Sequence, residues 1–233
     1  MMRFWERAAR VLLATALLAQ CIIPRCRAAV WDEGDIFKGC GEKCVALTFD
    51  DGPHETKTYE ILDILDKYGV AATFFMIGTN VSLYPDVARS VAERGHEIGN
   101  HTYSHAYLSD ASFETAAMEI EMCEDILYTT VGEVPHILRP PGGIYGSAAI
   151  EVARAFCDIV VLWSIDTRDW DHASTEKIVN TVEKNVRGGD IILMHDYVSG
   201  TSHTAEALDI IIPLLLSQGY TFVTVSDMYL NYR

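Results

Sequence analysis

Basic residues are scarce in this 233-residue chain, and no cluster of Lys and Arg follows the first thirty residues. The chain has 18 Lys and Arg against 33 Asp and Glu, which gives a formal net charge of -15 at pH 7. Such an acidic chain would repel the phosphates of a nucleic acid unless it had a local basic patch. The composition therefore argues against nucleic acid as a partner.

The sequence also lacks internal repeats, low-complexity tracts and any linker long enough to divide it. Its length is sufficient for one large hydrophobic core and falls short of the length that would require two domains. We therefore expect one domain over residues 44–233, preceded by a short lead-in over residues 29–43. We also expect the chain to be a monomer.

Residues 1–28 differ in composition from the rest of the chain. Three arginines precede the apolar segment VLLATALLAQCII, and CRAA offers small residues where a signal peptidase could cut after Ala28. The apolar segment is shorter than the roughly 20 residues that a membrane-spanning helix prefers, so we expect a cleaved signal peptide, with a retained anchor as the alternative. The protein would then be secreted or associated with the cell envelope, without a stable membrane span.

Four cysteines would remain after removal of the signal: Cys40, Cys44, Cys123 and Cys157. Cys40 and Cys44 are close enough in sequence to form a small disulfide loop ahead of the first strand, as exported proteins allow. Unpaired buried thiols are an equally good interpretation. The cysteine pairing stays open.

Short β-rich segments alternate with amphipathic helical segments from residue 44 onward. We predict seven strands, at 45–49, 72–77, 96–99, 136–138, 159–165, 191–194 and 221–225. We predict six helices, at about 57–68, 85–94, 112–128, 147–156, 175–187 and 204–217. This alternation is typical of an α/β fold with a parallel sheet. Seven strands suggest either an incomplete (β/α) barrel, one unit short, or an open doubly wound sheet.

Polar and ionisable side chains follow most of these strands. In both architectures ligands bind at the carboxyl ends of the strands, so these side chains would converge at one edge. The ionisable side chains in these positions are Asp50, Asp51, His101, Arg139, Asp166 and His195. Their convergence predicts a functional site.

Asp51, His101 and His105 form a candidate metal site. In GNHTYSH the two histidines are four residues apart, which on a helical turn places both imidazoles on one face. Two histidines and one carboxylate suit Zn2+ or a similar divalent ion and leave a coordination position open for water, as in catalytic sites. Bound water of this kind has a pKa of about 7 and is a nucleophile at neutral pH.

The second aspartate of the pair, Asp50, has a different candidate task. One carboxylate can bind the metal while the other accepts the proton of the attacking water. A turn is the alternative interpretation of DDGP. Arg139 in LRPPGG is available to hold Asp50 ionised and oriented, and the glycine amides that follow could donate to an oxyanion.

His195 ends a strongly apolar strand and is a candidate general acid. Asp166 in SIDTRDW could pair with it and raise its pKa, and Asp196 competes for that partnership. Trp170 and Tyr145 are candidates for an aromatic wall against a sugar ring.

Five segments, TFDDGP, HEIGNHTYSH, RPPGG, DTRDW and IILMHD, occur in the order and approximate spacing of the motifs of polysaccharide deacetylases. The sequence resembles this family, the NodB-homology domain of carbohydrate esterase family 4, over about residues 44–228. The resemblance implies a distorted, incomplete (β/α) barrel, in agreement with the predicted strand number. It also implies a metal-dependent hydrolase that removes N-acetyl groups from an amino-sugar polymer, either peptidoglycan or a chitin-like glycan.

The resemblance assigns a role to each candidate residue. It implies three metal ligands: Asp51, His101 and His105. It implies four catalytic residues: Asp50 as general base, His195 as general acid, Arg139 to orient the base and Asp166 to tune the acid. We expect five substrate-binding residues: Gly142, Gly143, Tyr145, Trp170 and Leu193. Zn2+ is the expected ion, and Co2+ or Ni2+ would also be accepted.

Gly142 departs from the family pattern, because the third motif usually carries an aromatic residue at that position. The backbone amide that the family uses there to bind the oxyanion can survive this change, but an aromatic wall is lost. Two rival functions remain: an O-acetyl esterase acting on acetylated xylan, which would use the same machinery, and a glycan-binding protein that has lost catalysis. The second predicts a damaged site, whereas every catalytic position is filled here.

Overall fold

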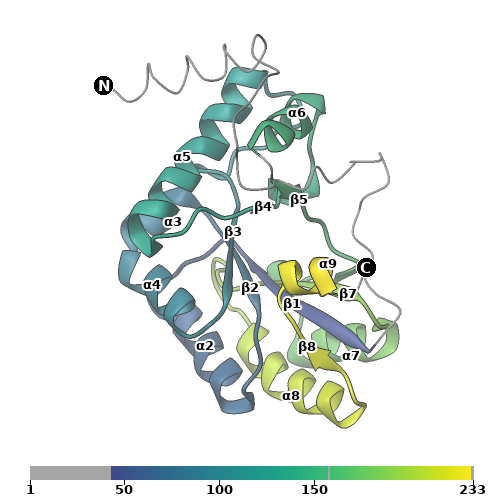
Figure 1. The fold of residues 1–233 in the computed structure, drawn as a ribbon. Helices are drawn as coiled ribbons and strands as arrows, with labels where there is room; N and C mark the ends of the chain where they lie inside the picture. Colours follow the sequence, from purple (N-terminus) through teal and green to yellow (C-terminus); the bar gives the residue numbers. More distant parts are fainter. Residues whose placement is uncertain (1–42, 157, 232–233) are drawn as a thin grey trace. The chain divides into compact units, whose positions relative to one another are not determined.

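The computed structural model describes residues 43–156 and 158–231, and within them the chain forms a parallel sheet that curves into an incomplete barrel with helices around it (Figure 1). The strands are β1 (Cys44–Asp50), β2 (Thr73–Met76), β3 (Glu97–Asn100), β4 (Ile137–Leu138), β5 (Ile159–Val160), β6 (Ile165–Asp166), β7 (Asp190–His195) and β8 (Thr221–Phe222). Seven of them follow the order β5-β4-β3-β2-β1-β7-β6, and β8 pairs with β1. The predicted distorted, incomplete barrel is confirmed.

Helices connect most successive strands, except that β5 leads directly to β6, and the last helix follows β8. They are α2 (Lys57–Tyr68), α3 (Gly78–Leu83), α4 (Pro85–Glu93), α5 (Phe113–Val131), α6 (Ser147–Phe156), α7 (Thr175–Asn185), α8 (Thr204–Ser217) and α9 (Val225–Asn231). Two short 3-10 turns, η1 (Pro141–Gly143) and η2 (Asp169–Asp171), lie in the loops after β4 and β6. All six predicted helices are present. The short helices α3 and α9 were not predicted, and α9 begins where the predicted last strand was expected to end.

The predicted strand 159–165 is wrong as a single strand. Its two ends pair at opposite edges of the sheet, β5 with β4 and β6 with β7. The segment between them spans the opening of the incomplete barrel. The carbonyls of Val161 and Leu162 in this segment accept hydrogen bonds from the Arg139 guanidinium, at 3.4 and 3.2 Å. A buried side chain, and not a neighbouring strand, therefore satisfies these backbone groups.

The central strand β1 is buried along its whole length, as expected for a parallel strand covered on both faces. Val45, Leu47 and Phe49 belong to the large core between the sheet and the outer helices. Ala46 belongs to a second core, inside the barrel, that also includes Met228 of α9. Because side chains alternate along a strand, Asp50 lies on the same inner face as Ala46, at the carboxyl end of β1.

Among the described residues, none of the helices combines the length and hydropathy needed to cross a bilayer. The predicted signal peptide and the lead-in over residues 29–43 fall almost wholly on residues outside the described ranges. The same holds for Cys40, so the question of its pairing with Cys44 stays open.

Candidate active site

Asp50 and Asp51 both face one site at the carboxyl end of β1, although neighbouring strand residues normally point to opposite faces. Asp50 is the last residue of β1 and is 3% exposed. Asp51 has a φ of 74°, in the left-handed region, so the chain turns at this residue. As a result, Oδ2 of Asp50 lies 3.8 Å and Oδ1 of Asp51 lies 3.3 Å from the same atom, Nε2 of His101.

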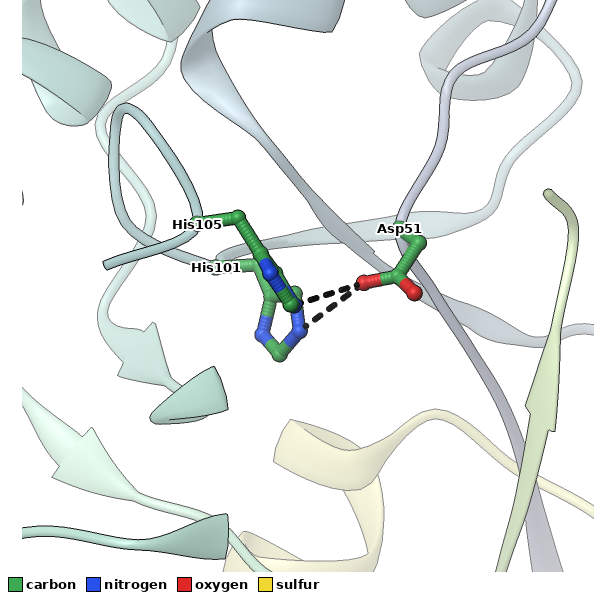
Figure 2. A group of neighbouring side chains, drawn as sticks. All are labelled: Asp51, His101 and His105. Carbon is green, nitrogen blue, oxygen red and sulfur yellow. Dashed lines mark ion pairs between the residues drawn. The ribbon is translucent and has the colours of Figure 1, made fainter. Parts of the chain in front are cut away.

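The side chains of Asp51, His101 and His105 converge on one point, as Figure 2 shows. Oδ1 of Asp51 lies 3.3 Å from Nε2 of His101 and 3.1 Å from Nε2 of His105. One ligand atom from each residue lies within 4.8 Å of the others. The structure thus brings together the three residues that the sequence predicted as metal ligands.

The hydrogen-bond chemistry of this cluster fits a cation. Nδ1 of His101 lies 2.7 Å from the carbonyl oxygen of Arg139, which can only accept, so Nδ1 carries the proton and Nε2 of the neutral ring is an acceptor. Oδ1 of Asp51 is buried and has no hydrogen-bond donor. Burial opposes ionisation of Asp51, but without an ion the two imidazoles can carry a proton at Nε2, and their hydrogen bonds and charge then hold the pKa of Asp51 well below its usual range. With Nε2 unprotonated, these acceptor atoms face one another without a donor, which suits a divalent ion.

The loop that carries the two histidines is not the helical turn that the spacing predicted. His101 follows β3, and the chain reaches His105 through a loop in which Thr102 and His105 have φ values of 64° and 61°. Glu119 of α5 holds this loop, because its carboxylate accepts from the amide and the hydroxyl of Ser104, both at 2.8 Å. The two rings lie 5.2 Å apart by centroid. Left-handed loop residues, and not helical periodicity, place both imidazoles on one side.

Arg139 follows β4 and is fully buried, with 0% exposure. Its NH1 group donates to Oδ1 of Asp50 at 2.7 Å and to the hydroxyl of Thr48 at 2.8 Å. Its guanidinium carbon lies 4.0 Å from the centroid of the Phe75 ring. Burial lowers the pKa of Arg139, and the charge of Asp50 opposes that shift. The arginine therefore contacts the predicted base directly and leaves Oδ2 of Asp50 free to face the site.

His195 ends β7, and its Cα is the register partner of Asp50 on β1, so the two residues lie side by side. Its hydrogen-bond partner is Asp169, not Asp166 as predicted. Nδ1 of His195 lies 2.9 Å from Oδ1 of Asp169, and the His195 amide donates to Oδ2 at 2.8 Å. Burial would lower the pKa of His195, but the hydrogen bond and charge of Asp169 outweigh it and raise the pKa to about 9.

Asp166 lies at the end of β6, and its carboxylate binds groups other than His195. Oδ1 of Asp166 accepts from the Arg168 amide at 2.8 Å and from Nε1 of Trp170 at 3.3 Å. The difference arises because η2 turns the chain back after Arg168, which has a φ of 57°, and this turn places the second aspartate of DTRDW beneath His195. Asp196, the other competitor, accepts from the Thr58 hydroxyl at 2.6 Å.

The predicted substrate-binding residues lie around the rim and floor of the same region. Trp170 is 45% exposed and Tyr145 is 37% exposed. Leu193 is 3% exposed and is the register partner of Thr48, so it lies on the inner face two residues before His195. The Gly143 amide donates to the Pro140 carbonyl at 2.9 Å, which leaves Gly142 as the candidate oxyanion donor of the two glycines.

Sequence reasoning missed two residues that hold this site together, Asp169 and Thr48. Asp169 is 1% exposed and also accepts from the Thr204 hydroxyl at 2.7 Å. Thr48 accepts from Arg139 and donates to the Ile192 carbonyl at 2.9 Å, so it joins β1, β7 and the arginine. The sequence indicated these residues only by their positions. Asp169 is the second aspartate of DTRDW, and Thr48 precedes Asp50 by two residues on the same strand.

Comparisons with known proteins agree with this geometry. The polysaccharide deacetylase family model matches residues 38–156. A peptidoglycan-N-acetylglucosamine deacetylase of Bacillus cereus is 45% identical over 194 residues, which cover 82% of this chain and 90% of the relative. The crystal structure of the Bc1960 peptidoglycan N-acetylglucosamine deacetylase matches with a TM-score of 0.80 at 39% identity, over 82% of this chain and 91% of that chain.

A family 4 acetyl xylan esterase from Clostridium thermocellum, solved with a cobalt ion, matches with a TM-score of 0.76 at 36% identity. That match covers 80% of this chain and 90% of the esterase chain. The five motifs, the incomplete barrel and these similarities lead to one conclusion. The chain belongs to the polysaccharide deacetylase family.

Proposed function

We propose that this protein is a metal-dependent N-deacetylase that hydrolyses the N-acetyl groups of an amino-sugar polymer, peptidoglycan or a chitin-like glycan. The observation that carries the proposal is the meeting of three ligand atoms from Asp51, His101 and His105 beside two further groups, Asp50 and His195. The similarity to a peptidoglycan-N-acetylglucosamine deacetylase supports the amino-sugar substrate. Water and the acetamide would yield acetate and a free amine.

A divalent ion held by Asp51, His101 and His105 would supply a nucleophilic water at neutral pH and polarise the acetamide carbonyl. Zn2+ is the ion that we propose, and the donor set also accepts Co2+ or Ni2+. Asp50 accepts the proton of the attacking water at Oδ2, because its Oδ1 is occupied by Arg139. The Gly142 amide is the proposed donor to the oxyanion.

His195 donates the proton that lets the amine leave. Its Nδ1–H donates to Asp169, so the proton for the departing nitrogen is carried by Nε2. A pKa raised to about 9 keeps this imidazole protonated at neutral pH, as a general acid requires. Asp50 and His195, which are register partners on β1 and β7, thus have opposite roles: the carboxylate is the base and the imidazolium is the acid.

The test is acetate release from three substrates side by side: N-acetylglucosamine oligomers, peptidoglycan and acetylated xylan. The proposal expects release from at least one of the two amino-sugar substrates at a rate well above that on xylan. Activity on acetylated xylan alone would reject it. Binding of glycans without turnover, both after chelation and after metal is added back, would favour the non-catalytic alternative.

An O-acetyl esterase acting on xylan is the second candidate. The similarity to a family 4 acetyl xylan esterase supports it. The same base, acid and metal ligands could serve an ester, whose alkoxide leaving group needs less help from His195 than an amine does. His195→Gln would therefore reduce amide hydrolysis far more than hydrolysis of an acetate ester such as 4-nitrophenyl acetate.

We further propose that the protein is exported and works outside the cytoplasm or at the cell envelope. The support is the sequence pattern of residues 1–28, with arginines ahead of a short apolar segment and small residues before the proposed cut. N-terminal sequencing of protein recovered from the culture medium tests this proposal. A cleaved protein beginning near Ala29 is expected, and recovery of the intact N-terminus from the cytosol would contradict it.

A further inference from the structure

Tyr107 places an aromatic ring at the edge of the site, and none of the five motifs predicted this residue. It follows His105 by two residues, and the two ring centroids lie 6.0 Å apart in an edge-on arrangement at 64°. Tyr107 is 61% exposed, so its side chain is accessible from solvent. Nothing in the proposed chemistry uses this residue.

The ring occupies the space beside Gly142. A Cβ atom added to Gly142 would lie 3.0 Å from Cε1 of Tyr107, which is tighter than ordinary van der Waals contact. A large side chain at residue 142 and the present position of Tyr107 therefore exclude each other. The aromatic surface that the third motif lacks at Gly142 is supplied at the same place by the loop after His105.

The backbone under Tyr107 is held firmly. Leu108 forms a β-bridge with Tyr145, and the Gly146 amide donates to the Leu108 carbonyl at 3.0 Å. A Cβ atom at Gly146 would lie only 2.3 Å from the carbonyl oxygen of Ser109, so the close approach of the two loops requires glycine there. Leu108 itself is 0% exposed. The backbone next to Tyr107 is thus anchored, so little backbone order has to be gained when a ligand packs against the ring.

We infer that Tyr107 is a substrate-binding residue that forms the aromatic wall of a sugar subsite beside the metal ligands, in the place of a side chain at residue 142. The apolar C–H face of an N-acetylhexosamine ring would pack against the tyrosine ring. The residue would contribute binding energy along the glycan and would not take part in proton transfer. This inference rests on the proposed function, because it identifies a subsite for the same substrate.

The test compares Tyr107→Ala, Tyr107→Leu and Tyr107→Phe, with Tyr128→Ala as the matched control. Tyr128 is 55% exposed and lies on α5, a helix that supplies none of the candidate catalytic residues or metal ligands. With an N-acetylglucosamine pentamer as substrate, the alanine variant is expected to raise KM about tenfold, with kcat changed less than threefold. The leucine variant should resemble alanine, whereas the phenylalanine variant and the control should keep the KM of the parent.

A binding titration of the chelated protein with the same pentamer separates this inference from the proposed function. Acetate release with the same KM in Tyr107→Ala and the parent would overturn the role of Tyr107 and leave the proposed function standing. Pentamer binding that weakens in Tyr107→Ala, in a protein that releases no acetate, would support Tyr107 and reject the proposed function. A fall in kcat alone, with KM unchanged and Tyr107→Phe equally affected, would also overturn the inference.

Discussion

Asp169→Asn tests most directly whether Asp169 orients and charges the proposed general acid, His195. Asp166→Asn is its matched control. The Asp169 carboxylate accepts at Oδ1 from Nδ1 of His195, the Thr167 hydroxyl and the Trp170 amide. At Oδ2 it accepts from the His195 amide and the Thr204 hydroxyl. An asparagine offers only one acceptor oxygen. Whichever way the amide is turned, one of the two His195 donors loses its partner.

The cost follows from these contacts. A buried donor left without a partner destabilises the fold by about 1–3 kcal/mol. A hydrogen bond to a charged group contributes about 1.5–3 kcal/mol, so its loss at Nδ1 should reduce kcat by roughly 10- to 150-fold. The pKa of His195 should also fall, because burial would then outweigh what remains of the support from residue 169.

The assay is acetate release at saturating substrate as a function of pH, together with urea unfolding. The pKa of His195, raised from 6.5 to about 9 in the folded protein, gives a stabilisation that is fully present below pH 6.5 and lost as the pH rises through 9. In Asp169→Asn the free energy of unfolding should depend less on pH, and the fall in kcat at alkaline pH should begin at a lower pH. Equal losses of kcat in Asp166→Asn and Asp169→Asn, or an unchanged fall in kcat at alkaline pH, would refute the assignment.

Three further predictions concern the rest of the site. Arg139→Met should lower the free energy of unfolding by about 3–5 kcal/mol in urea titrations, because it leaves the buried carboxylate of Asp50 without its partner; an unchanged midpoint would contradict this. Gly52→Ala should lower the thermal midpoint, with a destabilisation of about 1–3 kcal/mol, since its Cβ would lie 2.0 Å from Oδ2 of Asp196; parental stability would show that this contact is not tight. Chelation should abolish activity, and Zn2+ at 100 times its Kd should restore it with a stabilisation of about 2.7 kcal/mol that His101→Ala lacks.

Much of the fold could be predicted from the sequence, because the spacing of apolar residues indicates the helices and the change from apolar to polar residues indicates where strands end. Helices 57–68, 147–156 and 204–217 have the predicted ends, since each is amphipathic and lies between clear strand segments. Asp51 and His101 could be predicted because parallel strands deliver their carboxyl-end residues to one edge. His105 was predicted from a helical turn that the structure replaces with a loop.

The remaining features depend on tertiary contacts that local sequence does not encode. DTRDW contains two aspartates three residues apart, and only the η2 turn determines that Asp169 lies beneath His195. The run 159–165 has the composition of one strand, but its two ends pair at opposite edges of the sheet and Arg139 binds the carbonyls in its middle. Tyr107 went unrecognised because its partner in space, Gly142, is 35 residues away in the sequence.

The most direct measurement is anomalous diffraction from crystals of the protein grown with Zn2+. We expect one peak per chain within bonding distance of Asp51, His101 and His105, with the Asp50 carboxylate next to the ion but bound to Arg139. The peak should be lost in His101→Ala crystals. An ion held by other residues, or an equal peak in that variant, would contradict the account.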